Sequence, residues 1–570
     1  MPSAFQVLAA DYDGTLTNGA TPGAAVLDAI AEARRDGRRV VLVTGRILAE
    51  LRHAFAGVDD HFDAIVAENG AVLTGPAGHR RLAAPVAPAL EDALTRRAVP
   101  VRAGEVLLAC DAAHGVAVAE EIHRLGLDCQ VMYNRAALMV LPAGVSKGTG
   151  LSEALADLAV SPHSAIGVGD AENDHALLEA CELGVAVANA VPSLKERADV
   201  VLDEPDGAGV ASLLRGPILS GQQRVHPRRW QVELGRHTDK TVAAVPASQV
   251  NVLVTGGSRA GKSYTGGLIA EQLILLGYSV LVIDVEGDHT GLGDLRDVLV
   301  FDASGLPGPD DVPRLLRHRF VSVVLDLSSM APADQDAYVG EVAAAVRANR
   351  ADCGLPHWIV VDEAHRPFSA SVPIFSDTSR KGYCLITWQP GHLRPETIDD
   401  LDMVVALASP DGDDDQVTEF LTRWSPDDDL AGVLTRAEPG QALLSADPGR
   451  APVLVDLAER RTGHVRHWHK YATAELPVAK RFYFRRSSDE PTGRVAANVR
   501  EFHRILGHCG DDVIDHHTRN HDFSRWALHV LQDATLAASL SASEDTHVAT
   551  GDPPATRRGL LRAIETRYIA

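Results

Sequence analysis

Short apolar runs alternate with helical stretches over the first part of the chain, residues 5–214. The runs are FQVLAA, RRVVLVTG, FDAIVAENG, AIGVGD and ADVVLDE, and the stretches between them are rich in Ala, Leu, Glu and Arg. Apolar runs of strand length that alternate with helical segments are typical of a parallel sheet covered by helices. The pattern therefore predicts a first α/β domain over residues 1–215.

A second α/β series follows a basic, turn-rich segment. Residues 216–245 show no helical period and predict a linker and an opening strand. The runs NVLVTGG, YSVLVIDVEG, FVSVVLDLSS, HWIVVDEAH, YCLITWQP and DMVVALAS then predict one doubly wound parallel-sheet domain over residues 246–457. Residues 458–570 begin with a basic, aromatic stretch and predict a mainly helical C-terminal domain, with residues 541–559 as an exposed loop.

The composition is that of a globular protein of several domains. Of the 570 residues, 45% are hydrophobic and 23% charged, which excludes a disordered chain and a membrane protein. The six cysteines are far apart and form no C-x-x-C pair, so we expect neither a disulfide framework nor a zinc ribbon. No apolar run is long enough to span a membrane and no basic leader is present, so we expect a cytoplasmic protein.

Two aspartates directly follow the first apolar run. Asp11 and Asp13 stand in the segment VLAADYDGTLT, at the carboxyl end of the predicted strand, where ligands of open α/β sheets bind. Two carboxylates in one turn can share a divalent cation, and a carboxylate is also a competent nucleophile towards phosphorus. A single pair of this kind is more often a turn or a helix cap, so the interpretation depends on further residues.

Those further residues come in order at the ends of later strands. VLVTGR supplies Thr44, VSKGTGL supplies Lys147, and GVGDAENDHALL supplies Asp170, Asn173 and Asp174. Together with the first pair they resemble the four motifs of haloacid dehalogenase superfamily phosphatases, over residues 4 to about 205. AENGAVL, at residues 67–73, is similar to the segment that leads into the α/β cap of the sugar-phosphatase and phosphoglycolate-phosphatase branch.

The resemblance implies a Rossmann-like core, a small cap over about residues 74–141, and a mechanism. Asp11 would attack the phosphoryl group to form an aspartyl-phosphate, and Asp13 would protonate the leaving alcohol and then activate water. Mg²⁺ would be held by Asp11, the backbone carbonyl of Asp13, Asp170 and Asp174, and the phosphoryl oxygens by Thr44 and Lys147. A capped site favours a small phosphorylated metabolite as the substrate.

A second phosphate site is predicted where NVLVTGG leads into a helix. The segment has the pattern G-x-x-x-x-G-K-S, in which backbone N–H groups face a polyphosphate, the lysine reaches its oxygens and the serine binds Mg²⁺. HWIVVDEAH adds Asp362 as a further contact for Mg²⁺ and Glu363 as a base for the attacking water. The predicted ATP-binding residues are Gly256, Gly257, Ser258, Arg259, Ala260, Gly261, Lys262 and Ser263.

The segments LVIDVEGDH, VDEAHRPF and SRKGYCLITWQP extend this second pattern. They resemble HerA/FtsK-type P-loop ATPases, over about residues 230–456. The resemblance implies an ATP-hydrolysing domain in a homo-oligomer, commonly a hexameric ring that moves DNA, with Arg380 as a candidate for reaching the next subunit's nucleotide. Family members usually have T-Q-[RQ]-P where this chain has Trp388 and then Gln389. Either the polar sensor is lost at Trp388 or Gln389 takes its place, so turnover, or its coupling to DNA, is in question.

The end of the chain is less informative. Residues 460–486 are basic and aromatic, as in surfaces that bind single-stranded nucleic acid, but a strand pair with aromatic core residues is favoured because the net charge is −23. Histidines at 464, 467, 469, 516, 517 and 521 suggest a metal site, although solvated or core-bonded histidines are favoured.

The sequence therefore indicates a bifunctional protein, a Mg²⁺-dependent phosphatase joined to a HerA-like ATPase, with no membrane contact. Two alternatives stay open. One is a nucleic-acid end-processing enzyme that pairs a phosphatase with a 5′-kinase. The other is a DNA-translocating or defence-type ring ATPase in which the phosphatase is an accessory.

Overall fold

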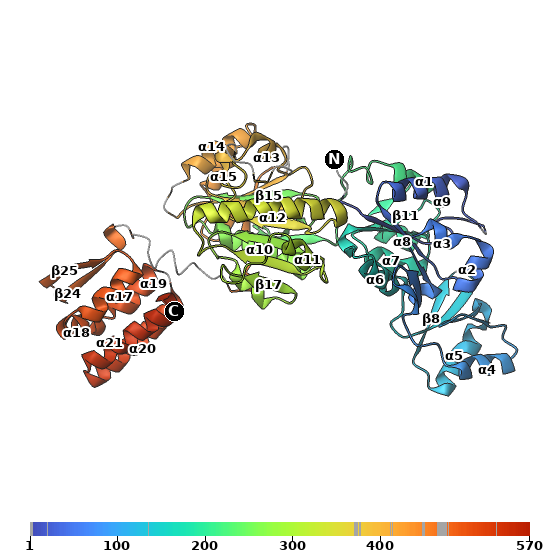
Figure 1. Ribbon diagram of the computed structural model, residues 1–570, viewed down its shortest axis with the longest axis horizontal. Helices are drawn as coiled ribbons and strands as arrows, with labels where there is room; N and C mark the ends of the chain where they lie inside the picture. The colour runs from blue at the N-terminus through green and yellow to red at the C-terminus, as the bar shows by residue number, and fades with distance from the viewer. Residues whose placement is uncertain are drawn as a thin grey trace. The chain divides into compact units, whose positions relative to one another are not determined.

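The computed structural model describes two compact units, Met1–His464 and Val465–Ala570 (Figure 1). The described residues are 4–569 except 20, 135, 370–373, 376–377, 411, 413, 447–450, 464–475, 477, 489 and 532. No helix among these residues is long and apolar enough to cross a membrane.

The first sheet has eight strands in the order β12-β11-β10-β1-β2-β3-β4-β5. All pairs from β12 to β3 are parallel, and β4 and β5 add an antiparallel hairpin at the edge. The strands are β1 (Val7–Ala10), β2 (Arg39–Val43), β3 (Ala64–Ala67), β4 (Val72–Gly75), β5 (Gly78–Arg81), β10 (Ala165–Gly169), β11 (Leu183–Ala186) and β12 (Val200–Val201).

Amphipathic helices cover this sheet. Helix α1 buries Val26, Ala29, Ile30 and Ala33, a spacing that puts all four side chains on one face of the helix. The α-helices of the core are α1 (Ala24–Arg35), α2 (Leu48–Ala54), α3 (Val58–His61), α6 (Lys147–Asp157), α7 (His175–Glu179), α8 (Pro192–Arg197) and α9 (Asp206–Arg215).

The inserted cap is a separate four-stranded sheet in the order β6-β7-β9-β8. Its elements are α4 (Pro88–Arg96), β6 (Arg102–Ala103), β7 (Leu108–Asp111), α5 (Gly115–Leu125), β8 (Cys129–Asn134) and β9 (Ala137–Pro142). The cap begins after Arg81, later than the predicted Thr74, because the hairpin β4–β5 hydrogen-bonds to β3 of the core sheet. Sequence alternation alone does not tell which sheet a hairpin joins.

The second sheet has eleven strands in the order β14-β13-β23-β22-β21-β15-β20-β19-β16-β18-β17. The strands from β21 to β17 are parallel, and the other four are antiparallel. The strands are β13 (Gln231–His237), β14 (Val242–Pro246), β15 (Asn251–Gly256), β16 (Val280–Asp284), β17 (Val298–Phe301), β18 (Ser322–Asp326), β19 (Trp358–Val361), β20 (Tyr383–Thr387), β21 (Met403–Leu407), β22 (Gln441–Ala446) and β23 (Val453–Leu457). Residues 216–245, predicted as a linker and an opening strand, thus contain β13 and most of β14.

Helices lie on both faces of the second sheet. Ile269 and Leu273 of α10 (Lys262–Leu275) pack with Val252 and Val254 of β15 on one face. On the other face, α12 (Pro332–Cys353), the long helix in Figure 1, packs against Leu253 through side chains that include Val342. The remaining α-helices of this part are α11 (Asp311–Arg317), α13 (Pro395–Asp399), α14 (Asp415–Trp424) and α15 (Leu430–Leu434).

A buried polar cluster joins the two sheets within the first unit. Glu182, 1% exposed, accepts a hydrogen bond from Tyr278 Oη at 2.8 Å and lies 2.8 Å from His163 Nδ1. Ser248 donates to the second oxygen of Glu182, and the rings of His163 and Tyr278 stack with their centres 3.7 Å apart. Both oxygens of this buried carboxylate therefore have partners, as burial requires.

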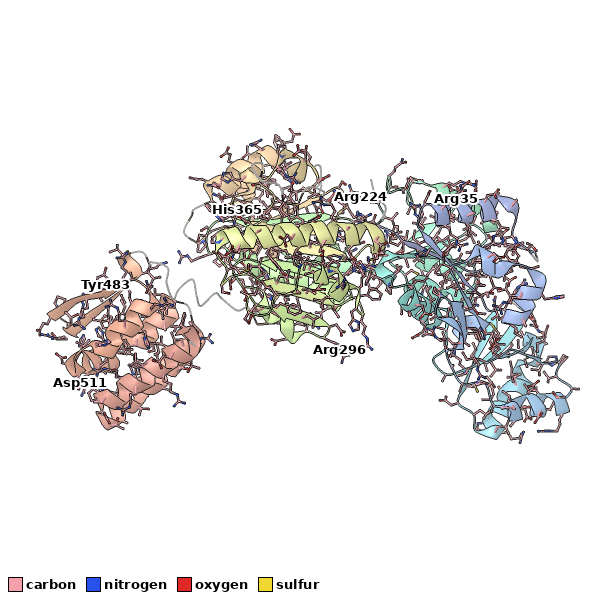
Figure 2. All side chains as sticks on the ribbon, in the orientation of Figure 1. Arg35, Arg224, Arg296, His365, Tyr483 and Asp511 are labelled. Carbon is pink, nitrogen blue, oxygen red and sulfur yellow. The ribbon has the colours of Figure 1, made fainter. Side chains whose placement is uncertain are left out.

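The second unit consists of helices and one hairpin. The α-helices are α17 (Val499–His508), α18 (Asp511–Arg519), α19 (Asp522–His529), α20 (Ala534–Thr550) and α21 (Pro553–Ile564), and the strands are β24 (Phe482–Ser487) and β25 (Glu490–Ala496). Phe482 and Phe484 are buried in its core, whereas Tyr483 between them is exposed (Figure 2). This agrees with the favoured interpretation of the aromatic stretch, although residues 464–475 and 477 lie outside the described residues.

The prediction of an exposed loop over residues 541–559 is wrong. These residues form the end of α20 and the start of α21. Glu544 and His547, at most 1% exposed, face the core, and Gly551 at φ +63° ends the first helix before Asp552 caps the second. The small and polar residues suggested a loop, but several of them have partners inside the unit: Glu544 Oε1 accepts the N–H groups of Phe523 and Ser524, and His547 bonds to Thr556 and Asp515.

Candidate functional site

Three adjacent strands of the first sheet bring the predicted phosphatase residues to one edge. Asp11 follows β1, Thr44 follows β2 and Asp170 follows β10, and these strands are neighbours in the order β10-β1-β2. Because the strands are parallel, their carboxyl ends meet at the same edge of the sheet. Lys147 is the first residue of α6, whose N-terminus is capped by Ser146.

Three buried carboxylates form the centre of this site. Asp11, Asp170 and Asp174 are at most 4% exposed, and one ligand oxygen of each lies within 4.8 Å of the others. Asp174 Oδ2 accepts the backbone N–H groups of Asp170 and Ala171, both at 2.9 Å, which fixes its orientation. Hard, anionic oxygen ligands in this number are those that Mg²⁺ prefers, so the residues fit the predicted ion.

Lys147 forms ion pairs with two of these carboxylates. Its Nζ lies 2.5 Å from Asp11 Oδ1 and 2.6 Å from Asp174 Oδ1, and its side chain is 1% exposed. Burial alone would lower the pKa of Lys147, but Asp11 and Asp174 outweigh it and raise this pKa above its usual value. The lysine therefore carries its charge where an incoming phosphoryl group would meet Asp11.

The surroundings of Asp11 disfavour its negative charge. Burial, reinforced by the charge of Asp174, raises the pKa of Asp11 well above its usual value, and Lys147 opposes this shift. A divalent cation beside Asp11 would act in the same direction as Lys147. The site as a whole is therefore built to receive further positive charge.

Arg46 is a site residue that the sequence analysis missed. Its guanidinium donates from Nε to Asp13 Oδ2 at 2.7 Å and from a terminal nitrogen to Asp13 Oδ1, and it lies 4.8 Å from the centre of the Tyr12 ring. Asp13 is half exposed and is not part of the carboxylate cluster. Arg46 stands two residues after Thr44, but only the adjacency of β1 and β2 shows which carboxylate it holds.

Asn69 and Asn173 connect the site to the cap. Asn173 Nδ2 donates to Asn69 Oδ1 at 3.1 Å, and Asn69 Nδ2 contacts the sulfur of Met132 on cap strand β8 at 2.8 Å. Asn69 has φ +56°, a left-handed conformation that asparagine tolerates better than most residues. The cap strand therefore lies directly over the loop that carries Asp174.

Glu68 anchors the entry to the cap. Its fully buried carboxylate accepts the backbone N–H groups of Glu105, Val106 and Leu107 at 2.8, 2.9 and 3.1 Å. Gly104 precedes them, and a Cβ at this position would lie 2.5 Å from the Glu68 carboxylate. The segment between β6 and β7 is thus fixed to the core by one side chain.

A family model for haloacid dehalogenase-like hydrolases matches residues 8–83 and 118–214. A phosphoglycolate phosphatase of Pyrobaculum islandicum is 32% identical over 232 residues, which are 38% of this chain and 96% of that protein. The chain belongs to the haloacid dehalogenase-like hydrolase family. The match to the haloacid dehalogenase-like model includes Asp11, Thr44, Asp170 and Asp174, ends at residue 214 and leaves out much of the cap.

Other relatives of this haloacid dehalogenase-like chain are aligned over differing shares of their length. Phosphoglycolate phosphatase 2 of Saccharolobus solfataricus is 43% identical over 101 residues, 18% of this chain and 41% of that protein. The phosphoglycolate phosphatase of Methanothermobacter thermautotrophicus is 29% identical over 220 residues, 37% of this chain and 98% of that protein. A solved haloacid dehalogenase-like hydrolase from Bacteroides thetaiotaomicron is 20% identical, with 37% of this chain and 98% of that chain covered and a TM-score of 0.32.

The second predicted site lies between β15 and α10. Gly261, at φ +98°, precedes Lys262, the first residue of the helix, and Lys262 Nζ donates to the backbone carbonyl of Gly257 at 2.8 Å. A Cβ at Gly256 would lie 2.6 Å from the Leu407 carbonyl, so this position requires glycine. The predicted residues 256–263 therefore form a strand-to-helix turn in which Lys262 folds back over its own loop.

The other predicted residues of this site follow β19 and β20. Asp362 is 3% exposed and Glu363 is the next residue, at φ +49°. Gln389 donates its backbone N–H to Thr387 Oγ1, while Trp388 is 40% exposed. Arg380 lies before the start of β20, at the opposite end of that strand from Thr387.

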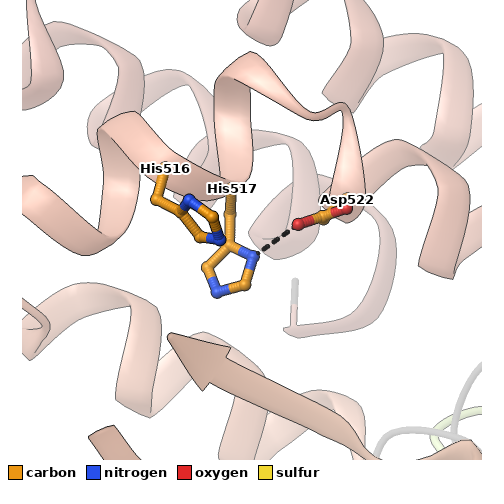
Figure 3. A group of neighbouring side chains, drawn as sticks. All are labelled: His516, His517 and Asp522. Atoms are coloured by element: carbon orange, nitrogen blue, oxygen red, sulfur yellow. Dashed lines mark hydrogen bonds and ion pairs between the residues drawn. The ribbon is translucent and has the colours of Figure 1, made fainter. Parts of the chain in front are cut away.

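Both ring nitrogens of His517 in the second unit already have hydrogen-bond partners. His516, His517 and Asp522 are close together (Figure 3), but His517 Nδ1 bonds to Asp522 Oδ2 at 2.7 Å and His517 Nε2 accepts the Arg485 N–H at 2.8 Å. His517, 3% exposed, is therefore a satisfied core histidine, as the favoured interpretation expected. The histidines at 464, 467 and 469 lie outside the described residues.

Proposed function

We propose that the N-terminal part of this chain is a Mg²⁺-dependent phosphomonoesterase that transfers the phosphoryl group to Asp11. The observation that carries the proposal is the contact of Lys147 Nζ with both Asp11 and Asp174, inside a cluster of three buried carboxylates. One charged lysine and a dication beside these carboxylates would create the positive site that a phosphoryl group needs.

Each side chain has one role in the proposed reaction. Asp11 attacks phosphorus, through the Oδ2 oxygen that Lys147 does not contact, while Asp13 gives a proton to the departing alcohol oxygen. Asp13 then takes a proton from water, which hydrolyses the aspartyl-phosphate and releases inorganic phosphate. Mg²⁺, held by Asp11, Asp170, Asp174 and the backbone carbonyl of Asp13, would neutralise the phosphoryl oxygens, and Thr44 and Lys147 would bind them.

The substrate we propose is a small phosphorylated metabolite. The contact of Met132 with Asn69 supports this choice, since it places a cap strand over the loop beside the site, and a covered site favours small substrates. The relatives named phosphoglycolate phosphatase make a short phosphorylated acid the first candidate.

A panel of phosphorylated metabolites and 3′- and 5′-phosphorylated oligonucleotides would test this function. Phosphate release should require Mg²⁺, favour the small esters and be lost in Asp11→Asn. Preferential hydrolysis of the oligonucleotides would instead support the end-processing alternative. An Asp11→Asn protein with full turnover would contradict the proposal outright.

A second activity, ATP binding and hydrolysis, is favoured by the turn at residues 256–263. The start of α10 at Lys262 and the buried Asp362 at the end of β19 support a site in which Lys262 and Ser263 hold the phosphates and Mg²⁺. Glu363 would activate the attacking water, and Gln389 would sense the phosphate. Lys262→Ala should abolish ATP binding, measured by titration calorimetry, and leave phosphomonoester hydrolysis unchanged.

Assembly into a ring that moves DNA is a proposal from the sequence resemblance. It requires DNA-stimulated ATP hydrolysis by a particle several times the mass of one chain. Transfer of the ATP γ-phosphate to a nucleic-acid 5′ end would favour the kinase alternative, and neither result would affect the phosphatase assignment.

A further inference from the structure

Three further metal-ligating side chains lie together in the second sheet. Asp284 ends β16, Asp362 follows β19, and these strands are paired so that Ile283 lies opposite Val361. His289 comes from the loop after β16. The three side chains are at most 3% exposed, and one ligand atom of each lies within 4.8 Å of the others.

His289 lacks the hydrogen bonds that a buried imidazole needs. Neither Nδ1 nor Nε2 has a hydrogen-bond partner among the described residues, and the same holds for Asp362 Oδ2. His289 Nε2 and Asp362 Oδ2 lie 3.6 Å apart, which is too long for a hydrogen bond. His517 in the second unit, with both ring nitrogens bonded, shows how a structural histidine of this chain is satisfied.

The spacing and the charges suit a bound cation. Two ligand atoms on one tetrahedral ion, each with a bond of about 2.1 Å, are roughly 3.4 Å apart, close to the separation seen here. The carboxylates of Asp284 and Asp362 would balance one divalent charge if His289 is neutral, so no net charge would be left buried. The N–H groups of Gly287 and His289 bond to Asp284 and hold its carboxylate in place.

We propose that Asp284, His289 and Asp362 form a site for a divalent transition-metal ion, of the type of Mn²⁺, Co²⁺ or Zn²⁺, in preference to Mg²⁺. An imidazole ligand favours these ions, whereas Mg²⁺ prefers a shell of oxygen atoms and water. The proposal does not depend on the phosphatase function, and the ion is expected to bind without nucleotide. The sequence predicted that Asp362 contacts the Mg²⁺ that accompanies ATP. In the site proposed here, Asp362 binds an ion that the protein holds without nucleotide.

Cobalt binding to the full-length, chelator-treated protein tests the site. In excess Mg²⁺, which fills the all-oxygen phosphatase site, the parent chain should retain about one equivalent of Co²⁺ with visible d–d absorption. His289→Asn should weaken this binding by about tenfold or more. His517→Asn is the matched control, because it removes an equally buried histidine that has both partners, and Asp174→Asn removes only a phosphatase ligand.

The outcomes separate clearly. Loss of the Co²⁺ spectrum in His289→Asn and Asp362→Asn, with both controls unchanged, would support the site. A parent chain that binds no Co²⁺ in excess Mg²⁺, or a His289→Asn protein with the parent spectrum, would overturn it. If His289→Asn does not fold, pulsed EPR of the Mn²⁺-loaded parent decides: nitrogen coupling to the ion supports the proposal and its absence overturns it.

Discussion

Arg46 holds Asp13 through both carboxylate oxygens, with Nε 2.7 Å from Oδ2. This pair separates the two aspartates of the first motif. Asp11 belongs to the buried carboxylate cluster with Lys147, whereas Asp13 lies outside this cluster and is half exposed. In the reaction proposed above, Arg46 is a positioning residue that would act on the leaving group only through Asp13.

Removing Arg46 should affect protonation of the leaving group more than substrate binding. We expect Arg46→Ala to lower kcat by roughly 10–100-fold with a smaller change in KM, because Asp13 loses its fixed orientation. The loss should be greater for alkyl phosphates than for p-nitrophenyl phosphate, whose leaving group needs no proton. Steady-state kinetics on both substrates would measure the difference.

Arg52→Ala is the control for this prediction. Arg52 also forms a two-point ion pair, with Asp59, but on the surface of the core. Its loss should leave both substrates unaffected. An equal fall of kcat for the two substrates in Arg46→Ala would mean that Arg46 does not act through Asp13.

Lys147 should stabilise the fold most when no metal is bound. Lys147→Met leaves Asp11 and Asp174 buried without their cation, which costs about 3–5 kcal/mol for a buried pair. Mg²⁺ would replace part of the lost charge, so the rise in Tm on adding Mg²⁺ should be greater in Lys147→Met than in the parent. A smaller rise in the variant would show that Lys147 is needed to assemble the metal ligands.

Glu68 should determine how firmly the cap entry is held. Glu68→Gln places an amide N–H₂ group among three backbone donors, and we expect a loss of about 1–3 kcal/mol in stability. Gly104→Ala should act in the same direction through its contact with Glu68. Glu179→Gln, at an exposed carboxylate of the core that pairs with Arg197 and does not touch the cap, is the control. Urea unfolding, followed by far-ultraviolet circular dichroism, would compare the stabilities of the variants. Equal unfolding midpoints for Glu68→Gln and the parent would show that Glu68 does not anchor the cap entry.

His357 should make the first unit less stable in acid. Burial, with His163 and Arg350 nearby, lowers the pKa of His357 well below 6.5, and its Nδ1 accepts the Ser279 N–H at 2.9 Å. The unfolded chain therefore binds a proton that the folded chain does not, and stability is lost as the pH falls below 6.5, by at most about 1.4 kcal/mol per pH unit. His357→Asn should reduce this slope.

Urea midpoints at about pH 7.5 and about pH 5.5 would measure that slope. His123→Asn, at an exposed position of α5, should keep the slope of the parent. The attribution to His357 fails if His357→Asn and the parent lose the same stability between the two pH values.

Strands could be predicted from the sequence wherever an apolar run ended at a glycine or a polar residue of one of the motifs. All six runs predicted for the second domain are strands, from β15 to β21. The strand β17 was missed because its side chains are only partly buried. The strands β22 and β23, which follow helices α14 and α15, were missed because neither strand ends at a recognisable motif. The helices over residues 541–559 were missed because this segment is rich in small and polar residues, a composition that is typical of loops.

The same contrast holds for the sites. Asp11, Lys147, Asp170 and Asp174 could be predicted because they stand in three short motifs, of which one holds both Asp170 and Asp174. Arg46 and Glu68 could not, since their partners are recognisable only when strands and cap are folded. His289 stands in LVIDVEGDH, a segment that the sequence analysis used only for its resemblance to HerA/FtsK-type ATPases. That its ring nitrogens have no hydrogen-bond partner can be seen only in the folded structure.

The central claim is that Asp11 carries the phosphoryl group. Rapid acid quenching of the enzyme during turnover, followed by peptide mass spectrometry, tests it most directly. We expect one added phosphoryl group on the peptide that contains Asp11, present in the parent with substrate and Mg²⁺ and absent in Asp11→Asn. Turnover without any phosphorylated peptide, or with the phosphoryl group on another residue, would contradict it.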